Sequence, residues 1–114
     1  MGKPAQQLTK AVTTYLTGAG VFWWRNSSGG MYRGDAQGNA RFVTFGQPGV
    51  ADLCALYHGH FIAIEIKAGK DTLRDSQKAW LEKVVKSGGI IVVCHEVEDV
   101  IRVIAALREK DWLK

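Results

Sequence analysis

The chain has 114 residues, of which 46% are hydrophobic and 23% charged, a composition typical of one folded domain and not of a disordered segment. Its 15 basic and 11 acidic residues give a net charge of +4, a sign that favours polyanionic partners such as nucleic acid. The longest apolar run, "IIVVC" at 90–94, is too short to cross a membrane, and the N-terminus lacks the apolar segment of a secretory signal. We therefore expect a single domain over 1–114, without a membrane partner, located in the cytoplasm.

The first part of the sequence predicts a helix, a short strand and a long irregular segment. Residues 3–20, "KPAQQLTKAVTTYLTGAG", have apolar side chains at helical spacing, and glycines close the stretch. "VFWWR" at 21–25 predicts a strand in which Trp23 and Trp24 point to opposite faces, so at least one is expected in the core instead of stacking on bases. From 26 to 49 the sequence is rich in Gly, Ser, Asn and Gln and is interrupted only by "RFVTF", which predicts a long irregular segment with a function or with mobility.

The middle of the chain predicts a β-hairpin. "ADLCALY" at 51–57 and "FIAIEIK" at 61–67 have the composition of strands, and His58-Gly59 between them suits a tight turn. The second stretch carries apolar residues on both faces, as expected of a central strand that is covered on each side.

The remaining sequence predicts a helix, a strand and a closing helix. "DTLRDSQKAWLEKVVKSGG" at 71–89 has a helical pattern, with Thr72 and Asp75 as a capping box. "IIVVC" then predicts a buried strand, and "VEDVIRVIAALREK" at 97–110 predicts the last helix. The order αβββαβα indicates a mixed α/β sheet flanked by helices, with its last two strands parallel through a right-handed crossover.

The predicted hairpin brings three charged side chains together. When pairing is counted outward from a turn of two or four residues, Asp52 lies opposite Glu65, with Cβ atoms about 5 Å apart, and Lys67 points to the same face. Facing carboxylates repel, and Mg²⁺, which uses one or two carboxylates and keeps positions for water and phosphate, would relieve the repulsion. Lys67 could then orient or deprotonate the attacking water, or stabilise charge on phosphate oxygens. The pattern indicates metal-dependent phosphodiester hydrolysis; the alternative is a salt bridge between Glu65 and Lys67 on a solvent-facing edge.

Three motifs carry a resemblance to a known family. "GVAD" at 49–52, "IEIK" at 64–67 and "SQKAWL" at 76–81, the last followed by "GG" and an apolar strand, resemble the VRR-NUC family of the PD-(D/E)XK nuclease superfamily. The resemblance covers nearly the whole chain and is of the stand-alone type found in phages and bacteria. It implies a restriction-endonuclease-like fold with an αβββαβ core, a mixed four-stranded sheet flanked by helices, and an additional C-terminal helix.

The resemblance also implies roles for individual residues. Asp52 and Glu65 would bind Mg²⁺, for which Mn²⁺ can substitute, with the backbone carbonyl of Ile66 as a third ligand. Lys67 would be the catalytic lysine, and Gln77 matches a glutamine that relatives carry near the site on the following helix. Without the family, Gln77 could be an ordinary polar helix residue, although its place on the apolar face argues against this.

The sequence departs from the family pattern in its first helix. Many relatives carry a glutamate there that reaches the metal site, whereas this chain reads "PAQQLTK" at 4–10 and has no acid before Asp35. Gln6 and Gln7 are the candidates for a place near the site. The "RN" at 25–26 also matches the family, without a role attached to it.

Basic side chains that flank the predicted site in the sequence are candidates for contacts with DNA phosphates. The set comprises Arg25, Arg33, Arg41, Lys70 and Arg74. Each could equally be a solvated surface charge, so the expectation concerns the set and not any single member.

A zinc site is a second metal-binding hypothesis. Its candidate ligands are Cys54, His58, His60, Cys94 and His95. They do not have the spacing of standard zinc sites, and the predicted hairpin separates the two turn histidines from the nearest cysteine. Turn histidines and buried, reduced cysteines of an intracellular protein are the expected interpretation.

The sequence therefore predicts a Mg²⁺- or Mn²⁺-dependent endodeoxyribonuclease. The resemblance implies structure-selective cutting of branched DNA, with four-way (Holliday) junctions as the expected substrate. A two-fold symmetric junction must be cut on two strands, which favours a homodimer or higher homo-oligomer. The alternatives are a flap, nicking or restriction-like nuclease, a DNA-binding module of the same fold that does not cut, and a basic structural subunit of a larger assembly.

Overall fold

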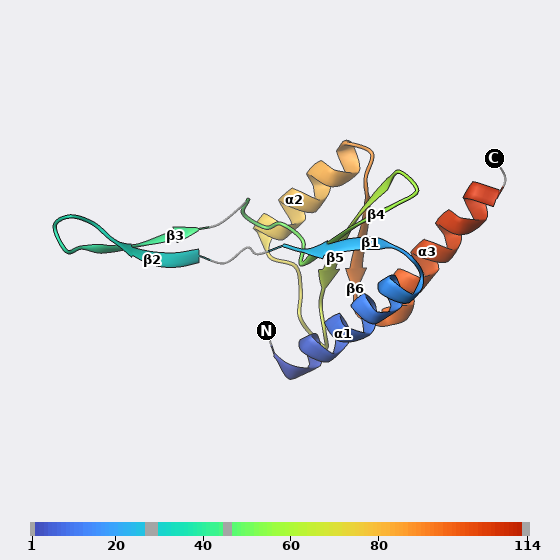
Figure 1. Ribbon diagram of the computed structural model, residues 1–114, viewed down its shortest axis with the longest axis horizontal. Coiled ribbons are helices and arrows are strands. Elements are labelled where there is room, and N and C mark those ends of the chain that lie inside the picture. The colour runs from blue at the N-terminus through green and yellow to red at the C-terminus, as the bar shows by residue number, and fades with distance from the viewer. Residues whose placement is uncertain (1, 27–29, 45–46, 113–114) are drawn as a thin grey trace.

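The computed structural model describes residues 2–26, 30–44 and 47–112, which form three helices and six strands (Figure 1). In chain order these are α1 (Lys3–Gly18), β1 (Phe22–Arg25), β2 (Gly30–Gly34), β3 (Ala40–Thr44), β4 (Leu53–Tyr57), β5 (His60–Ile66), α2 (Asp75–Lys86), β6 (Ile90–Cys94) and α3 (Val97–Trp112). Within these ranges, no helix has both the length and the apolar character needed to cross a lipid bilayer.

Four of the strands form a mixed sheet in the order β1-β4-β5-β6. β4 pairs antiparallel with β1 and with β5, whereas β6 pairs parallel with β5 after the crossover through α2. The predicted mixed α/β sheet and the predicted parallel last pair are confirmed. The arrangement is consistent with a restriction-endonuclease-like core, to which α3 adds a C-terminal helix.

A two-residue turn fixes the register between β4 and β5. His58 and Gly59 both have positive φ, 47° and 82°, as a type I′ hairpin turn requires. Tyr57 therefore pairs with His60, and the ladder continues outward to the pair Leu53–Ile64. One further step along this ladder brings the position of Asp52 opposite that of Glu65, as the sequence predicts.

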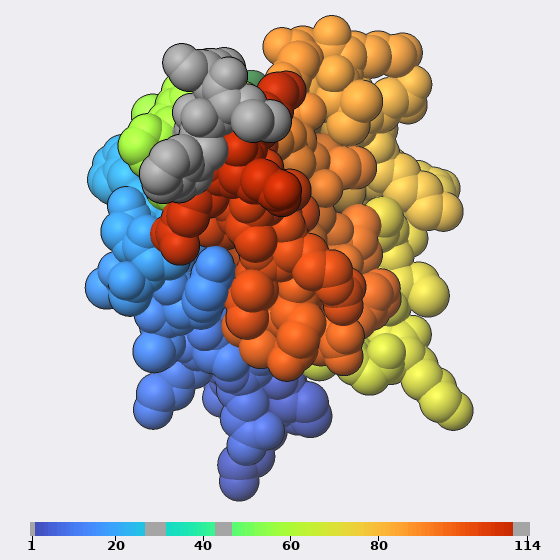
Figure 2. All heavy atoms as spheres, turned by 90° about the vertical axis from the view of Figure 1, so that its right-hand side faces the viewer, coloured from blue at the N-terminus to red at the C-terminus, as the bar shows by residue number. Residues whose placement is uncertain are grey.

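Helices cover both faces of the sheet. α1 and α3 pack on one face and form the larger core, and α2 packs on the other (Figure 1). α1 and α3 also lie against each other, which Figure 2 shows from the side. Arg108 of α3 joins three elements, because its Nε donates to the Tyr57 hydroxyl at 3.1 Å and a terminal guanidinium nitrogen donates to the Ala19 carbonyl at 3.3 Å.

The two tryptophans of β1 point to opposite faces of the sheet, as predicted. Trp23 packs against the larger core, and its Nε1 donates to the Thr17 hydroxyl at 2.8 Å. Trp24 lies on the other face in a row of aromatic rings, with centroid distances of 5.4 Å to Phe22 and 6.3 Å to Phe61.

α2 begins later than its sequence pattern indicates. The predicted capping box of Thr72 and Asp75 is wrong, because the helix starts at Asp75 and Arg74 occupies the N-cap position. The side chain of Gln77, within the first turn, accepts a hydrogen bond from the Arg74 backbone N–H at 2.9 Å. This bond satisfies a main-chain donor at the helix start, and the residues before Arg74 remain a loop.

The segment predicted to be irregular contains a second hairpin. β2 and β3 pair antiparallel over five residue pairs, from Gly30–Thr44 to Gly34–Ala40, as a separate two-stranded sheet. Asp35 organises its turn, since Oδ1 accepts hydrogen bonds from the backbone N–H groups of Gln37 and Asn39 at 3.0 and 2.8 Å. The prediction of an irregular segment was therefore wrong for Gly30–Gly34 and Ala40–Thr44, and the last residue of "RFVTF" lies outside the described residues.

Gly49 precedes the Asp52 position in a conformation that a side chain would disturb in two ways. Its φ is +76°, and a Cβ there would overlap the backbone carbonyl of Ser76 at the start of α2. The "GVAD" motif thus needs glycine because the loop touches the helix backbone.

Replacing Gly49 with alanine should destabilise the protein by roughly 2–4 kcal/mol, since backbone strain and overlap with Ser76 add. Gly20→Ala is the matched control, because Gly20 has φ +75° but open space where the added methyl would lie. Its cost should be only the strain of about 1–2 kcal/mol. Denaturant unfolding of both variants measures the difference, and equal losses would contradict the contact with α2.

Candidate active site

A hollow of about 460 Å³, here called the Glu65 pocket, opens at the end of β5 between the first residues of α1 and of α2. It is lined by Gly2, Ala5, Asp52, Glu65, Ile66, Lys67, Asp71, Thr72, Arg74 and Gln77. The structure therefore brings together the four residues predicted to be catalytic, the backbone predicted as a third ligand, and one of the five predicted DNA-binding residues.

Glu65 is the buried acid of this pocket. Its side chain lies on the α2 face of β5 and is only 1% exposed. Oε1 accepts a hydrogen bond from Nε2 of Gln77 at 3.0 Å, whereas no donor among the residues that the structure describes reaches Oε2. The carboxyl of Asp52 is near enough to share a proton with this acid. A buried carboxylate oxygen without a donor is costly, so this atom is suited to a ligand that enters the pocket.

Gln77 fixes the orientation of Glu65. It is 4% exposed, and its Oε1 accepts from the Arg74 backbone N–H while its Nε2 donates to Glu65. Because the backbone N–H can only donate, the amide has one orientation that satisfies both bonds. The same side chain thus caps α2 and holds the acid in place.

Asp52 reaches the pocket from the opposite strand. Its Oδ2 accepts a hydrogen bond from the Ile66 backbone N–H at 2.8 Å. This bond bridges the two strands beyond the last pair of the ladder, between Leu53 and Ile64. The carboxyl group is thereby set beside the peptide that links Glu65 to Ile66.

Asn26 holds the backbone on both sides of Asp52. Its side-chain amide donates to the Ala51 carbonyl at 3.0 Å and to Sγ of Cys54 at 2.9 Å, and its backbone N–H donates to the Asp52 carbonyl at 3.0 Å. Sequence reasoning assigned no role to this residue. Its only signal was its place directly after the β1 strand, within the "RN" at 25–26.

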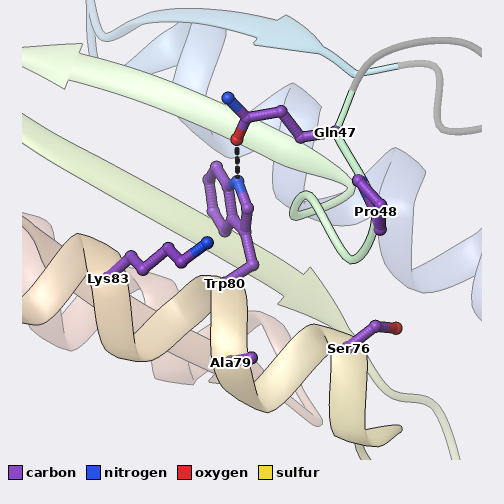
Figure 3. A pocket seen from close by; sticks show the side chains of 6 residues that line it. All are labelled: Gln47, Pro48, Ser76, Ala79, Trp80 and Lys83. Carbon is purple, nitrogen blue, oxygen red and sulfur yellow. Dashed lines mark hydrogen bonds between the residues drawn. The ribbon is translucent and has the colours of Figure 1, made fainter.

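The loop before Asp52 is fastened to α2 on its other side (Figure 3). Nε1 of Trp80 donates to Oε1 of Gln47 at 2.8 Å, and Gly49 lies against Ser76. A second hollow of about 410 Å³ remains between loop and helix, lined by Gln47, Pro48, Ser76, Ala79, Trp80 and Lys83. The segment around Asp52 is therefore held from two sides, by α2 and by Asn26.

Lys67 supplies positive charge next to the two acids. Its backbone N–H donates to the Cys94 carbonyl at 2.9 Å, and its carbonyl is 2.9 Å from Nδ1 of His95. A carbonyl can only accept, so His95 carries its proton on Nδ1 in this bond. A smaller hollow of about 310 Å³ continues from Lys67 to Lys78 and His95, two residues that sequence reasoning did not connect with the site.

The electrostatics of the pocket favour a proton or a cation on Glu65. The pKa of Glu65 is raised from 4.5 to about 8, first by burial and then by the hydrogen bond and charge of Asp52, while the charges of Lys67 and Arg74 oppose the rise. Burial disfavours the charged form of an acid, and a second carboxyl disfavours it further. Near neutral pH the acid is thus largely protonated until a cation takes the place of the proton.

The oxygen atoms present fit a hard divalent cation. The carboxyls of Asp52 and Glu65 and the carbonyl of Ile66 are oxygen donors at one pocket, and Mg²⁺ ordinarily combines one or two carboxylates with water. Among residues 2–26, 30–44 and 47–112, no cluster of three or more His, Cys, Asp or Glu side chains could hold a metal ion. A cation here would therefore use main-chain oxygen and water beside the two acids.

The other predicted residues lie outside the Glu65 pocket. Gly2, which caps α1, and Ala5 within the helix form part of its wall, and Gln6 and Gln7 do not line it. Four of the five residues predicted to bind DNA also do not line the pocket. They are Arg25 at the end of β1, Arg33 and Arg41 on β2 and β3, and Lys70 on the exposed loop after β5. Cys54 and Cys94, two of the zinc candidates, are buried free thiols.

Glu65→Gln should make the stability of the metal-free protein less dependent on pH. Because the folded pKa lies above the unfolded value of 4.5, the stabilising protonation is complete below about pH 4.5 and is lost as the pH rises through about 8. Relative to wild type, the variant should gain roughly 4 kcal/mol between about pH 5 and 9. Unfolding of both proteins in EDTA across this range measures the gain, and other titrating groups cancel in the difference. A constant difference would contradict a raised pKa for Glu65.

The sequence matches the family model of the VRR-NUC domain over residues 35–98. This match runs from the Asp35 turn through β3, β4, β5, α2 and β6. None of the curated proteins matches the chain. The matched region is more than half of the sequence and contains Asp52, Glu65, Ile66, Lys67 and Gln77, so the chain belongs to the VRR-NUC family and carries a nuclease-type domain, which implies DNA as its substrate.

Proposed function

We propose that the protein is an endodeoxyribonuclease that depends on Mg²⁺, with Mn²⁺ able to replace it. The observation that carries the proposal is the buried Oε2 of Glu65, which no donor among the described residues reaches, in the pocket that Asp52 and Lys67 also line. A polar atom that the fold buries without a donor is best explained by a cation that binds there. Asp52, Glu65 and the Ile66 carbonyl would hold this ion.

A bound divalent ion would polarise the scissile phosphate and lower the pKa of a water molecule. The chain's own groups perform the rest. Gln77 keeps Glu65 in one orientation through its bonds to the acid and to Arg74. The Lys67 ammonium, at the same pocket, orients the attacking water and stabilises negative charge on the phosphate oxygens.

We propose branched DNA, and four-way junctions above all, as the preferred substrate. This part rests on the resemblance to stand-alone members of the family. A junction with two-fold symmetry needs two cuts, so two copies of the chain would act together as a homodimer or higher homo-oligomer. Arg25, Arg33, Arg41, Lys70 and Arg74 would contact phosphates, which suits recognition of DNA shape over base sequence.

One observation favours a second candidate, a DNA-binding module that does not cut. The N-cap residue Gly2 and Ala5 of α1 line the pocket, and neither has a side chain that can ligate a metal. In this case the pocket would bind a cation or a DNA phosphate, and the phosphodiester bond would stay intact. Metal-dependent cleavage separates the two candidates.

Lys67→Ala should lower the rate of cleavage by at least roughly 100-fold while DNA binding is retained, because the lysine acts on the charge that develops during reaction. The assay uses a labelled four-way junction and a matched linear duplex with Mg²⁺, Mn²⁺ or EDTA, and wild type should cut the junction faster. Lys86→Ala is the control, since this lysine is exposed at the end of α2. If wild type binds but cuts no junction, flap or duplex in either metal, the non-cleaving module replaces the nuclease.

Binding of Mg²⁺ should release about one proton near pH 7, because Glu65 must lose its proton to become a ligand. With a pKa of about 8, the apparent affinity should rise with pH up to that value and then level off. Calorimetry in two buffers of different ionisation enthalpy counts the protons. Glu82→Gln, which removes an exposed carboxyl of α2, should behave like wild type. Binding that is independent of pH from about 6 to 8 would show that Glu65 is not the titrating ligand.

A further inference from the structure

The β2–β3 hairpin extends away from the rest of the molecule (Figure 1). The chain measures 62 × 31 × 25 Å, and the hairpin occupies one end of the long dimension in Figure 1. Two-stranded ribbons are marginally stable on their own. Two questions follow: which contacts stabilise the projecting hairpin, and which partner its exposed side chains bind.

A pair of aromatic rings gives the ribbon its register. Tyr32 and Phe42 are directly paired across the strands, and their rings meet edge to face with centroids 5.3 Å apart. Both are exposed, by 72% and 55%. Such a cross-strand aromatic pair stabilises a hairpin, which gives these residues a structural purpose.

The next pair along the ladder carries two like charges. Arg33 and Arg41 are paired directly, and side chains at successive positions alternate between faces, so both lie on the face opposite the aromatic pair. Like charges in such a pair destabilise it. Both arginines are exposed, and no ion pair joins either one to a carboxylate within the described part of the chain.

The acid nearest to them in sequence is committed elsewhere. Asp35 uses Oδ1 to accept the N–H groups of Gln37 and Asn39 and so closes the turn. The repulsion between the two guanidinium groups is thus left for an anion outside the chain to relieve. Adjacent phosphates of a nucleic-acid backbone are anions of the right spacing and valence for two neighbouring arginines.

The ribbon is rooted in the loop that carries Asp52. After β3 the chain reaches Gln47, which Trp80 of α2 holds by a hydrogen bond of 2.8 Å, and then Gly49, which touches Ser76. Before β2 the chain leaves Asn26, whose backbone and side chain bind the segment around Asp52. The base of the ribbon is therefore tied to the segment that carries Asp52.

We propose that the β2–β3 hairpin is a DNA-binding arm that places Arg33 and Arg41 together on the phosphate backbone of the DNA that the Glu65 pocket acts on. The proposal rests on the proposed function for its choice of DNA as the anion. Two-stranded ribbons fit the major groove of duplex DNA, and the two arginines add affinity without reading base sequence. The arm thus contributes DNA affinity, and the Glu65 pocket would hydrolyse the phosphodiester bond.

The test measures the salt dependence of DNA binding in EDTA, so that no cleavage intervenes. Arg33→Ala/Arg41→Ala should bind a four-way junction and a duplex roughly 10- to 100-fold more weakly at low salt, and the slope of log affinity against log salt should decrease by about 2, one for each lost phosphate contact. Arg33→Lys/Arg41→Lys should restore the slope, because lysine keeps the charge. Lys86→Ala/Lys110→Ala removes the same net charge from the ends of α2 and α3 and should leave the slope within error of wild type.

Two results would overturn the proposal. One is an unchanged slope in the double alanine variant; the other is an equal decrease in the control, which would mean that net charge alone matters. Light scattering on each variant distinguishes one cause of an unchanged slope. If the oligomer mass changes while the slope does not, the hairpin contacts a second copy of the chain instead of DNA. The arm and the nuclease fail separately, because binding in EDTA does not depend on cleavage. If the protein shows the expected slopes but never cuts DNA, the hairpin is still a DNA-binding arm and only the proposed nuclease activity is wrong.

Discussion

The register between β4 and β5 is the constraint on which the candidate site depends. Because side chains alternate along a strand, a slip of one residue would move Glu65 from the α2 face to the core beneath α1 and α3. The type I′ turn at His58-Gly59 prevents this slip. The carboxyl of Asp52 then strengthens the same register from the far end by accepting the Ile66 N–H. The turn and the site thus lie at opposite ends of one ladder and fix each other.

The pocket shows how a fold tolerates an acid in a place where it would not otherwise be stable. One oxygen of Glu65 is satisfied by Gln77, and the other is left to what enters the pocket. If the protein donated hydrogen bonds to both oxygens, the buried acid would be stabilised, but neither oxygen would be available to a ligand. The partial satisfaction seen here keeps the side chain ordered and keeps its chemistry available.

Sequence reasoning reached the central sheet and the main residues of the pocket because these follow from local rules. The alternation in "FIAIEIK" and the turn dipeptide determine which side chains share a face. It failed where a contact between distant segments decides the outcome. The start of α2 is set by Gln77 bonding back to Arg74, and the strand at Gly30–Gly34 forms because β3 pairs with it. The role of Asn26 depends on partners 25 and 28 positions away, which no local pattern reports.

The anchoring of Asn26 and Gln47 has a consequence for how this protein could change. The two residues are tied down at the points where the chain leaves the main sheet and where it comes back, each by bonds to the body of the molecule. The described part of the chain between them, Gly30–Gly34 and Ala40–Thr44, pairs as a separate two-stranded sheet. We therefore expect that a change in the length of this hairpin would leave the Glu65 pocket in its register. In this sense the pocket and the hairpin can vary independently.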